Sequence, residues 1–233
     1  MSIIKDQQLQ ILLNQFELIS KNTLLQLTIL RKLIEDPHTE ELFEEALMNE
    51  ELIDRLEIKI REEVAYTVFK FSPMAEDLRR IISYQDLTTN LERIGDMVLN
   101  CIRSVIEIDL SQPEFYQEQQ LILSMLDNVT QMVRNAIVSF TNMELETAKS
   151  VMKSDDSVDN YYRELKHFLA EKNSGKSLSN QEILRIIQLE NIGHSLERCG
   201  DSATNIAEST FYLIVGWDVR HGKKSNEQDN DLQ

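Results

Sequence analysis

The stretch Leu91-Glu92-Arg93-Ile94-Gly95-Asp96 occurs a second time in this chain, as Leu196-Glu197-Arg198-Cys199-Gly200-Asp201. The two copies lie 105 residues apart, and the same spacing relates residues well outside the repeated stretch. Further pairs with this spacing are Arg80 with Arg185, Ile82 with Ile187, Asn100 with Asn205, Asp54 with Asp159 and Glu51 with Asp156. The chain therefore consists of two copies of one unit, and each copy retains acidic residues at equivalent positions.

The segments between the few helix-breaking residues predict long helices. Only six glycines and three prolines occur in 233 residues, and the segments between them are rich in Leu, Ile, Glu, Gln and Lys, which is typical of all-α proteins. The predicted helices are residues 6–35, 39–69, 74–108, 114–142, 145–171 and 180–215. We therefore predict an all-α fold of two tandem, pseudo-symmetric three-helix bundles, residues 1–110 and 111–221, followed by a polar tail (222–233) that is expected to be disordered.

Proline, glycine and serine positions predict where the helices end. Pro37 terminates the first predicted helix, because proline cannot continue one. Ser72 followed by Pro73 predicts an N-cap and first turn for the third helix. Residues 111–113, Ser-Gln-Pro, predict the link between the units, and Ser179 with Glu182 predicts a capping box that opens the last helix.

The overall charge limits the classes of partner. A net charge of −16 argues against nucleic acids, because binding phosphate groups requires clusters of Lys and Arg. It favours cations or a basic surface on another protein. Cys101 and Cys199 occupy non-equivalent positions, which indicates reduced thiols rather than a disulfide framework. We expect a cytoplasmic protein that is at most peripheral to a membrane, since neither a secretory signal nor a run of roughly 18 apolar residues is visible.

The repeated stretch forms an acidic stripe when it is placed on a helix. In each unit a Glu, an Asp and an Asn spaced by four residues share one face: Glu92, Asp96 and Asn100 in the first, and Glu197, Asp201 and Asn205 in the second. Two carboxylates at this spacing repel each other, and a cation between them reverses the effect. Glu, Asp and Asn oxygens are the ligands that hard divalent or trivalent cations prefer.

One helix cannot surround an ion, so the preceding helix is expected to contribute ligands. The second predicted helix offers Glu51 and Asp54, and the fifth offers Asp155, Asp156 and Asp159. If the chain turns near residue 72, Asp54 and Glu92 lie at similar distances from the turn. A mid-helix glycine costs about 1 kcal/mol relative to alanine. Its presence at both Gly95 and Gly200 therefore indicates that a neighbouring helix or a ligand lies close to the backbone at these positions.

Other interpretations of the acidic residues stay open at this point. Solvated helix faces in an acidic protein are the alternative explanation, and they account for a single acid more readily than for two matched sets. A ferritin-like di-iron site needs Glu-x-x-His pairs on helices, and the sole match, Glu35 with His38, contains a proline, while Glu190 and His194 are four residues apart. All-oxygen ligands do not distinguish iron, zinc, manganese, magnesium and calcium.

The repeated stretch, late in the third helix of each unit, resembles the PhoU family of phosphate-signalling regulators. Three further segments carry the resemblance: residues 74–79 (Met-Ala-Glu-Asp-Leu-Arg) at the opening of helix three, residues 51–57 in the acidic part of helix two, and residues 215–221, which end in Val-Arg-His. The resemblance covers nearly the whole chain, from about residue 9 to 221.

The resemblance implies a cytoplasmic, non-enzymatic regulator that restrains phosphate uptake and phosphate-starvation signalling. Family members act between a phosphate transporter and a sensor histidine kinase, bind multinuclear metal clusters through Glu/Asp-x-x-x-Asp motifs, and form homodimers or larger oligomers. The matching motif residues are Glu92 with Asp96 and Glu197 with Asp201. Asn90 and Ser195 replace an acid that the family commonly has before each stretch, which removes one ligand per site.

Two alternative functions remain from the sequence. PhoU-like domains also accompany Pit-type or sodium-type phosphate transporters, and this chain would then be an accessory protein of such a transporter. The other alternative is a carboxylate-bridged metalloenzyme on a helical bundle, which would need an enclosed site with an open metal position.

Overall fold

The computed structural model describes residues 2–36, 40–74 and 76–216. These residues form six α-helices and one short 3₁₀ helix, and no strand occurs among them. The helices are α1 (Ser2–Glu35), α2 (Glu40–Phe71), α3 (Glu76–Ile108), α4 (Tyr116–Asn142), α5 (Leu145–Lys172) and α6 (Asn180–Val215), with the 3₁₀ helix η1 (Pro113–Phe115) before α4. The all-α prediction is confirmed, and the predicted helix ends lie within four residues of the observed ones. The predicted polar tail, residues 222–233, lies outside the described residues, as do residues 217–221 of the closing segment.

Both ends of α6 follow from local chemistry. The predicted capping box is confirmed: the Ser179 hydroxyl accepts a hydrogen bond from the Glu182 N–H at 3.3 Å, and the Glu182 carboxylate accepts one from the Ser179 N–H at 2.8 Å. The helix ends at Gly216, whose φ of +85° lets its N–H bond to the Tyr212 carbonyl at 2.8 Å. A left-handed glycine in this position is a common helix terminator.

The predicted N-cap of the third helix at Ser72 is wrong. Ser72 has a φ of +43°, and its N–H donates to the Val68 carbonyl at 3.1 Å, so this residue closes α2. Within the described residues α3 begins at Glu76, and Pro73 lies in the connection between α2 and α3. A left-handed residue followed by proline is a helix-ending signal, and here it takes the place of the N-cap that the sequence pattern suggested.

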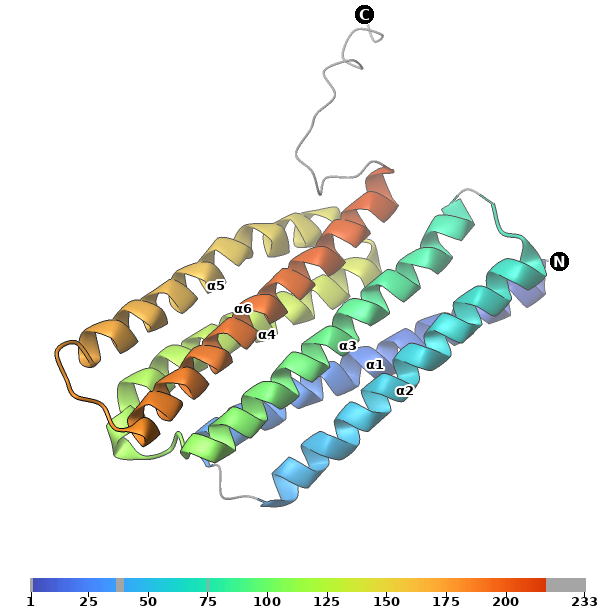
Figure 1. Cartoon of the computed structure of the whole chain (residues 1–233). Coiled ribbons are helices and arrows are strands. Elements are labelled where there is room, and N and C mark those ends of the chain that lie inside the picture. Colours follow the sequence, from blue (N-terminus) through green and yellow to red (C-terminus); the bar gives the residue numbers. More distant parts are fainter. Residues whose placement is uncertain (1, 37–39, 75, 217–233) are drawn as a thin grey trace, which may run out of the picture.

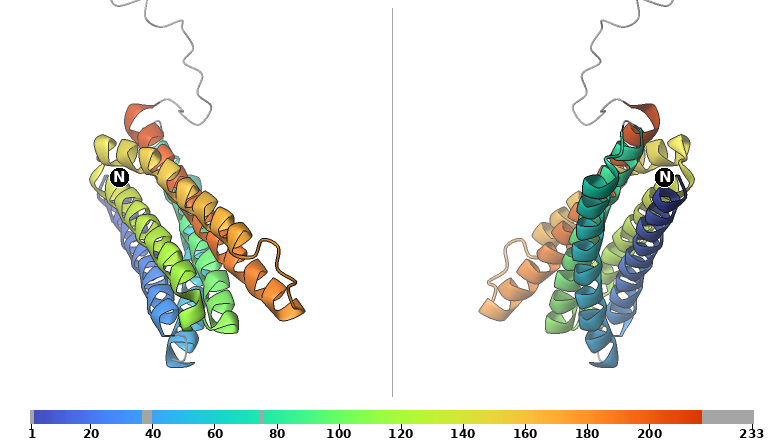
Figure 2. Two further views of the ribbon diagram at one scale, coloured as in Figure 1. Left: turned by 90° about the vertical axis from the view of Figure 1, so that its left-hand side faces the viewer. Right: turned by 90° about the vertical axis from the view of Figure 1, so that its right-hand side faces the viewer.

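The helices of each unit pack against one another, and the two units join through α3 and α6. Figure 1 shows these two helices side by side along the middle of the molecule, with α2 on one flank and α5 on the other. The views in Figure 2 show α1 and α4 together on another side, where they also contact each other. Both units therefore share one continuous hydrophobic core.

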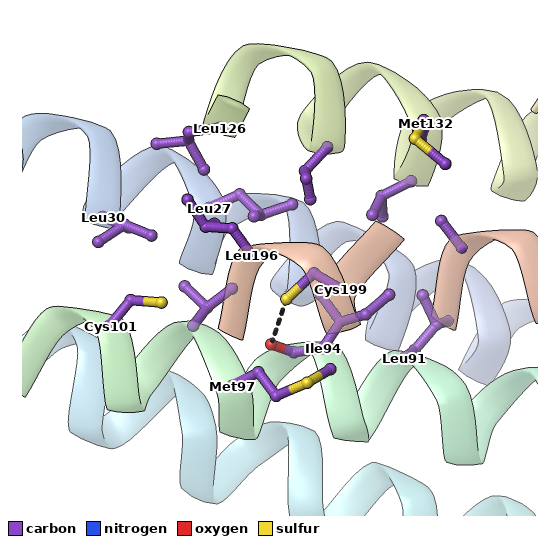
Figure 3. Close-up of a cluster of buried hydrophobic side chains, with 14 of the residues drawn as sticks. Leu27, Leu30, Leu91, Ile94, Met97, Cys101, Leu126, Met132, Leu196 and Cys199 are labelled. Carbon is purple, nitrogen blue, oxygen red and sulfur yellow. Dashed lines mark hydrogen bonds between the residues drawn. The ribbon is translucent and has the colours of Figure 1, made fainter. Parts of the chain in front are cut away.

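The apolar residues of the repeated stretch lie at the centre of this core. Leu91, Ile94, Leu196 and Cys199 are fully buried (Figure 3). The Cys199 thiol donates to the Ile94 carbonyl at 4.0 Å, although these two residues hold equivalent positions in the two units. Equivalent residues that face each other indicate an approximate two-fold relation between α3 and α6. Both cysteines are free and buried, and burial raises the pKa of the Cys101 thiol to about 12.

The acidic face of the repeated stretch lies opposite this core. On α3, Asp96 is exposed and Glu92 is partly exposed, and Asp201 and Glu197 have the same exposure classes on α6. The adjacent helices, α2 and α5, pack against α3 and α6 respectively. None of the described helices is both long and apolar enough to cross a bilayer.

Candidate functional site

Four carboxylates from α2 and α3 form the first acidic cluster. They are Glu50 and Asp54 on α2 and Glu92 and Asp96 on α3, and we call them cluster 1. Burial raises the pKa of Asp54, and the charges of Asp96 and Glu51 raise it further. Burial also raises the pKa of Glu92, with added contributions from Asp96 and Asp54. The predicted meeting of Asp54 with Glu92 and Asp96 is therefore present in the structure.

Glu50 is the most constrained member of cluster 1. Glu50 is 6% exposed, and neither of its carboxylate oxygens has a hydrogen-bond donor, so a hydrogen bond with the Asp96 carboxylate requires a proton on one of the two acids. Burial, followed by the charges of Asp96, Asp54 and Glu92, raises its pKa to about 8. A buried carboxylate without partners is costly when ionised, so at neutral pH this position favours a proton or a cation.

Gly95 makes room for Glu50. A β-carbon at position 95 would lie 2.9 Å and 3.2 Å from the two Glu50 carboxylate oxygens and 3.1 Å from the Ile53 methyl group. The first of these distances is shorter than side chains tolerate, so a larger residue would displace the carboxylate. The glycine of the repeated stretch thus allows α2 to place an acid directly over the backbone of α3.

Glu51, which the sequence grouped with Asp54, lies at the solvent edge of cluster 1, where its charge still acts on Asp54. Its side chain is 65% exposed and forms an ion pair with Arg55 on the solvent side of α2. The structure groups Glu50 with Asp54 instead. The signal that identifies Glu50 was present in the sequence, because residue 50 is four positions before Asp54 and 105 positions before Asp155.

The second unit repeats this arrangement at the equivalent positions. Cluster 2 consists of Asp155 and Asp159 on α5 and Glu197 and Asp201 on α6. Burial raises the pKa of Asp201, Asp155 and Glu197, and in each case acids of the same cluster raise it further. Asp159 contributes to all three of these shifts, so it lies with Glu197 and Asp201.

Cluster 2 differs from cluster 1 in its surroundings. Asp155 accepts a hydrogen bond from the Thr204 hydroxyl at 3.3 Å, which lowers its pKa against the larger effect of burial. A β-carbon at Gly200 would lie 3.4 Å from Val158 and 3.7 Å from Asp155, which is ordinary contact. His194 lies 3.5 Å from Glu197 and lowers the pKa of that residue. Cluster 2 is therefore less crowded than cluster 1.

The remaining predicted ligands lie at the edges of the clusters. Asp156 is exposed, at the position equivalent to Glu51. Asn100 is exposed and accepts a hydrogen bond from Arg103 at 3.2 Å. Asn205 is partly exposed one turn beyond Asp201. The structure thus brings four carboxylates together in each unit and leaves these three residues outside.

The donor atoms of both clusters fit a hard cation. Carboxylate oxygens are the preferred ligands of such ions, and a cation would offset the mutual repulsion that raises the pKa values. In residues 2–36, 40–74 and 76–216, no three His, Cys, Asp or Glu side chains already surround one point as metal ligands. A bound ion would therefore require the carboxylates to turn towards it, with Glu50 supplying oxygens that accept no hydrogen bond from a lysine, arginine, hydroxyl or amide.

Of the two Glu–His pairs considered for a di-iron site, the structure describes only Glu190 with His194. His38 lies outside the described residues. Glu190 accepts a hydrogen bond from the Tyr162 hydroxyl at 2.5 Å, and the His194 ring stacks on Tyr162 with ring centroids 5.9 Å apart. These side chains form an aromatic contact beside cluster 2.

Comparison with known proteins identifies the repeated unit. The family model described as the PhoU domain matches twice, at residues 17–105 and 122–210. A phosphate-specific transport system accessory protein PhoU homolog from Pseudomonas putida is 36% identical over 174 residues, which are 74% of this chain and 66% of that protein. A homolog with the same name from Clostridium acetobutylicum is 30% identical over 182 residues, which are 77% of this chain and 80% of that protein.

A solved structure shares the fold. The crystal structure of PhoU from Pseudomonas aeruginosa superposes with a TM-score of 0.81 at 26% identity, covering 91% of this chain and 99% of that one. These relatives are accessory proteins of a transport system, and the family is one of regulatory proteins rather than enzymes. With two PhoU domains and the corresponding six-helix fold, this chain belongs to the PhoU family.

Proposed function

We propose that this protein is a metal-binding, non-enzymatic regulator of phosphate uptake and phosphate-starvation signalling. It acts in the cytoplasm as an adaptor between the cytoplasmic components of a phosphate transporter and a sensor histidine kinase. The observation that supports this role most directly is the match to accessory proteins of the phosphate-specific transport system. The names of these relatives favour that transporter over the Pit-type or sodium-type alternatives.

The two acidic clusters support the metal-binding part of the proposal. Each cluster joins the acidic stripe of the repeated stretch to an adjacent helix, and burial and repulsion raise the pKa of most of its members. A divalent or trivalent cation would relieve that repulsion and hold α2 against α3, and α5 against α6. The all-oxygen donor set leaves iron, zinc, manganese, magnesium and calcium as candidates.

The regulatory effect requires a difference in affinity between states of the partner. An adaptor shifts a kinase or transporter towards its inactive state only if it binds that state more tightly. Bound cations would neutralise part of an acidic surface and so change which basic partner surfaces it fits. We expect the protein to act as a homodimer or larger oligomer. Light scattering coupled to size-exclusion chromatography would measure its molar mass in solution and so test this expectation.

A deletion strain tests the proposed role. We expect higher phosphate uptake and alkaline phosphatase activity in phosphate-rich medium without the gene, and restoration by the wild-type gene. Complementation with the Glu92→Gln/Asp96→Asn/Glu197→Gln/Asp201→Asn variant should restore less. Unchanged uptake and phosphatase in the deletion strain would exclude the regulatory role, whereas full restoration by the variant would exclude only the contribution of metal.

A further inference from the structure

A pocket distant from the acidic stripes lies where α4 begins, α5 ends and α6 begins. Its volume is about 230 Å³, and its base is apolar, with Leu169, Ile186 and Leu189 among the lining residues. Acidic and basic side chains from all three helices surround this base. Pockets that combine an apolar base with a few convergent polar groups are typical binding sites for small molecules.

One buried carboxylate in this pocket has an unused acceptor. The Glu118 side chain is 2% exposed, and its Oε1 atom accepts a hydrogen bond from Lys172 at 2.6 Å. Its Oε2 atom is also buried but has no hydrogen-bond partner. Because a buried acceptor without a donor costs free energy, this oxygen favours a ligand that carries an N–H or O–H group.

Three cationic side chains line the same pocket and keep unused donors. Lys172 donates to Glu118 and to the Glu114 carbonyl, at 2.9 Å, so one of its three N–H groups is left. Arg185 donates one N–H to the Glu114 carboxylate at 2.7 Å and lies over the Phe115 ring. Lys176 has no ion pair within 4 Å among the described residues. These donors would bind the oxygens of an anion.

The equivalent pocket of the first unit provides an internal comparison. It has about 190 Å³ and is lined by Leu9, Gln10, Leu13, Arg80 and Tyr84, which lie 105 residues before Glu114, Phe115, Glu118, Arg185 and Leu189. Only the arginine is common to both pockets. The positions equivalent to Lys172 and Lys176 hold Thr67 and Phe71. The fold therefore does not require the buried acid and the two lysines, which belong to the second unit alone.

We propose that the pocket of the second unit binds a small oxyanion that keeps a proton at neutral pH, as hydrogen phosphate does. The lysines and Arg185 would hold its charged oxygens, and Glu118 Oε2 would accept its O–H group. Sulfate has no such proton, so one of its negatively charged oxygens would lie against the negatively charged Glu118 carboxylate, and the two would repel each other. The choice of phosphate among such oxyanions rests on the proposed role in phosphate regulation.

Equilibrium dialysis of the full-length protein with radiolabelled phosphate tests the inference. Metal-free buffer keeps cation-bound phosphate at the acidic clusters from contributing. We expect one phosphate per chain, bound at least about tenfold more tightly than sulfate. Phosphoserine should compete more weakly than free phosphate, because a phosphate monoester has lost most of its second proton at neutral pH. An equal or stronger competition by phosphoserine would show that the pocket does not select the protonated oxyanion.

Three variants locate the site. Lys176→Gln should weaken phosphate binding about tenfold, since it removes an exposed charge without disturbing the core. Glu118→Gln should abolish the preference for phosphate over sulfate, because an amide can donate to either anion. Arg80→Gln, in the equivalent pocket, should leave binding unchanged.

Absence of phosphate binding, or a phosphate-to-sulfate ratio that Glu118→Gln leaves unchanged, would overturn the inference. If Glu118→Gln does not fold, unchanged binding by Lys176→Gln overturns it instead. A deletion strain with altered phosphate uptake, together with a protein that binds no phosphate, would refute the pocket while the proposed function stands.

Discussion

Gly95→Ala should destabilise the protein, whereas the equivalent change Gly200→Ala should not. Both substitutions remove a mid-helix glycine, which by itself stabilises by about 0.5–1 kcal/mol. The new methyl group at position 95 would lie 2.9 Å from the Glu50 carboxylate and 3.1 Å from Ile53, while at position 200 its nearest neighbour is Val158 at 3.4 Å. Overpacking in a buried site costs about 1–3 kcal/mol. We expect a net loss of about 1 kcal/mol for Gly95→Ala and a small gain for Gly200→Ala.

Urea denaturation followed by far-ultraviolet circular dichroism measures this difference. Because the two changes are chemically identical and lie in equivalent helices, helix propensity cancels in the comparison, and the remaining difference of about 2 kcal/mol reports the local packing. A Gly95→Ala variant as stable as Gly200→Ala would show that the Glu50 carboxylate moves aside at no cost and is not confined against the backbone of α3. In a Glu50→Ala background the methyl group has space, so Gly95→Ala should then cost less, with a coupling energy of about 1 kcal/mol.

Three further predictions concern proton binding and local contacts. In metal-free buffer the free energy of unfolding should fall as the pH rises from about 5 to 8, because the folded chain holds a proton on Glu50 (pKa about 8, against 4.5 ordinarily) that the unfolded chain has released. Glu50→Gln should reduce this slope by up to about 1.4 kcal/mol per pH unit, measured by urea denaturation at several pH values, and an unchanged slope would contradict the assignment. Ser179→Ala should cost about 1 kcal/mol in the same assay, since its hydroxyl caps α6; no loss would show that the cap contributes nothing. Arg31→Gln breaks an exposed ion pair with Asp127 and should change stability by less than about 1 kcal/mol, so a larger loss would indicate that this pair helps to hold the units together.

The helices and the repeat could be predicted from the sequence because both depend on local or periodic signals. Proline and glycine positions, the capping box at Ser179 and the 105-residue spacing gave six helices with nearly correct ends. The start of α3 was predicted wrongly because serine is a preferred N-cap residue, whereas Ser72 adopts a left-handed backbone conformation and ends α2. The choice between those two roles depends on how α2 ends, which a residue type alone does not determine.

The acidic clusters were predicted in outline but not in every member. Glu50 and Glu51 are adjacent acids on a helix that has charged residues on several faces. Their side chains point in directions about 100° apart around the helix axis. Only the packing of α2 against Gly95 decides that Glu50 points towards α3 while Glu51 points to solvent. The close contact of α3 with α6 also depends on tertiary packing, since the periodicity of one helix does not identify its partner.

Metal binding by the two clusters is tested most directly by titrating metal-free protein with Mn²⁺ and counting bound ions by electron paramagnetic resonance. The matched variants Glu50→Gln/Asp96→Asn and Asp155→Asn/Asp201→Asn each disable one cluster, and Glu51→Gln controls for the loss of an exposed acid. We predict that each double variant loses the ions of its own cluster only, that combining them abolishes binding, and that Glu51→Gln binds as the wild type does. Equal binding by the wild type and the combined variant would contradict the account.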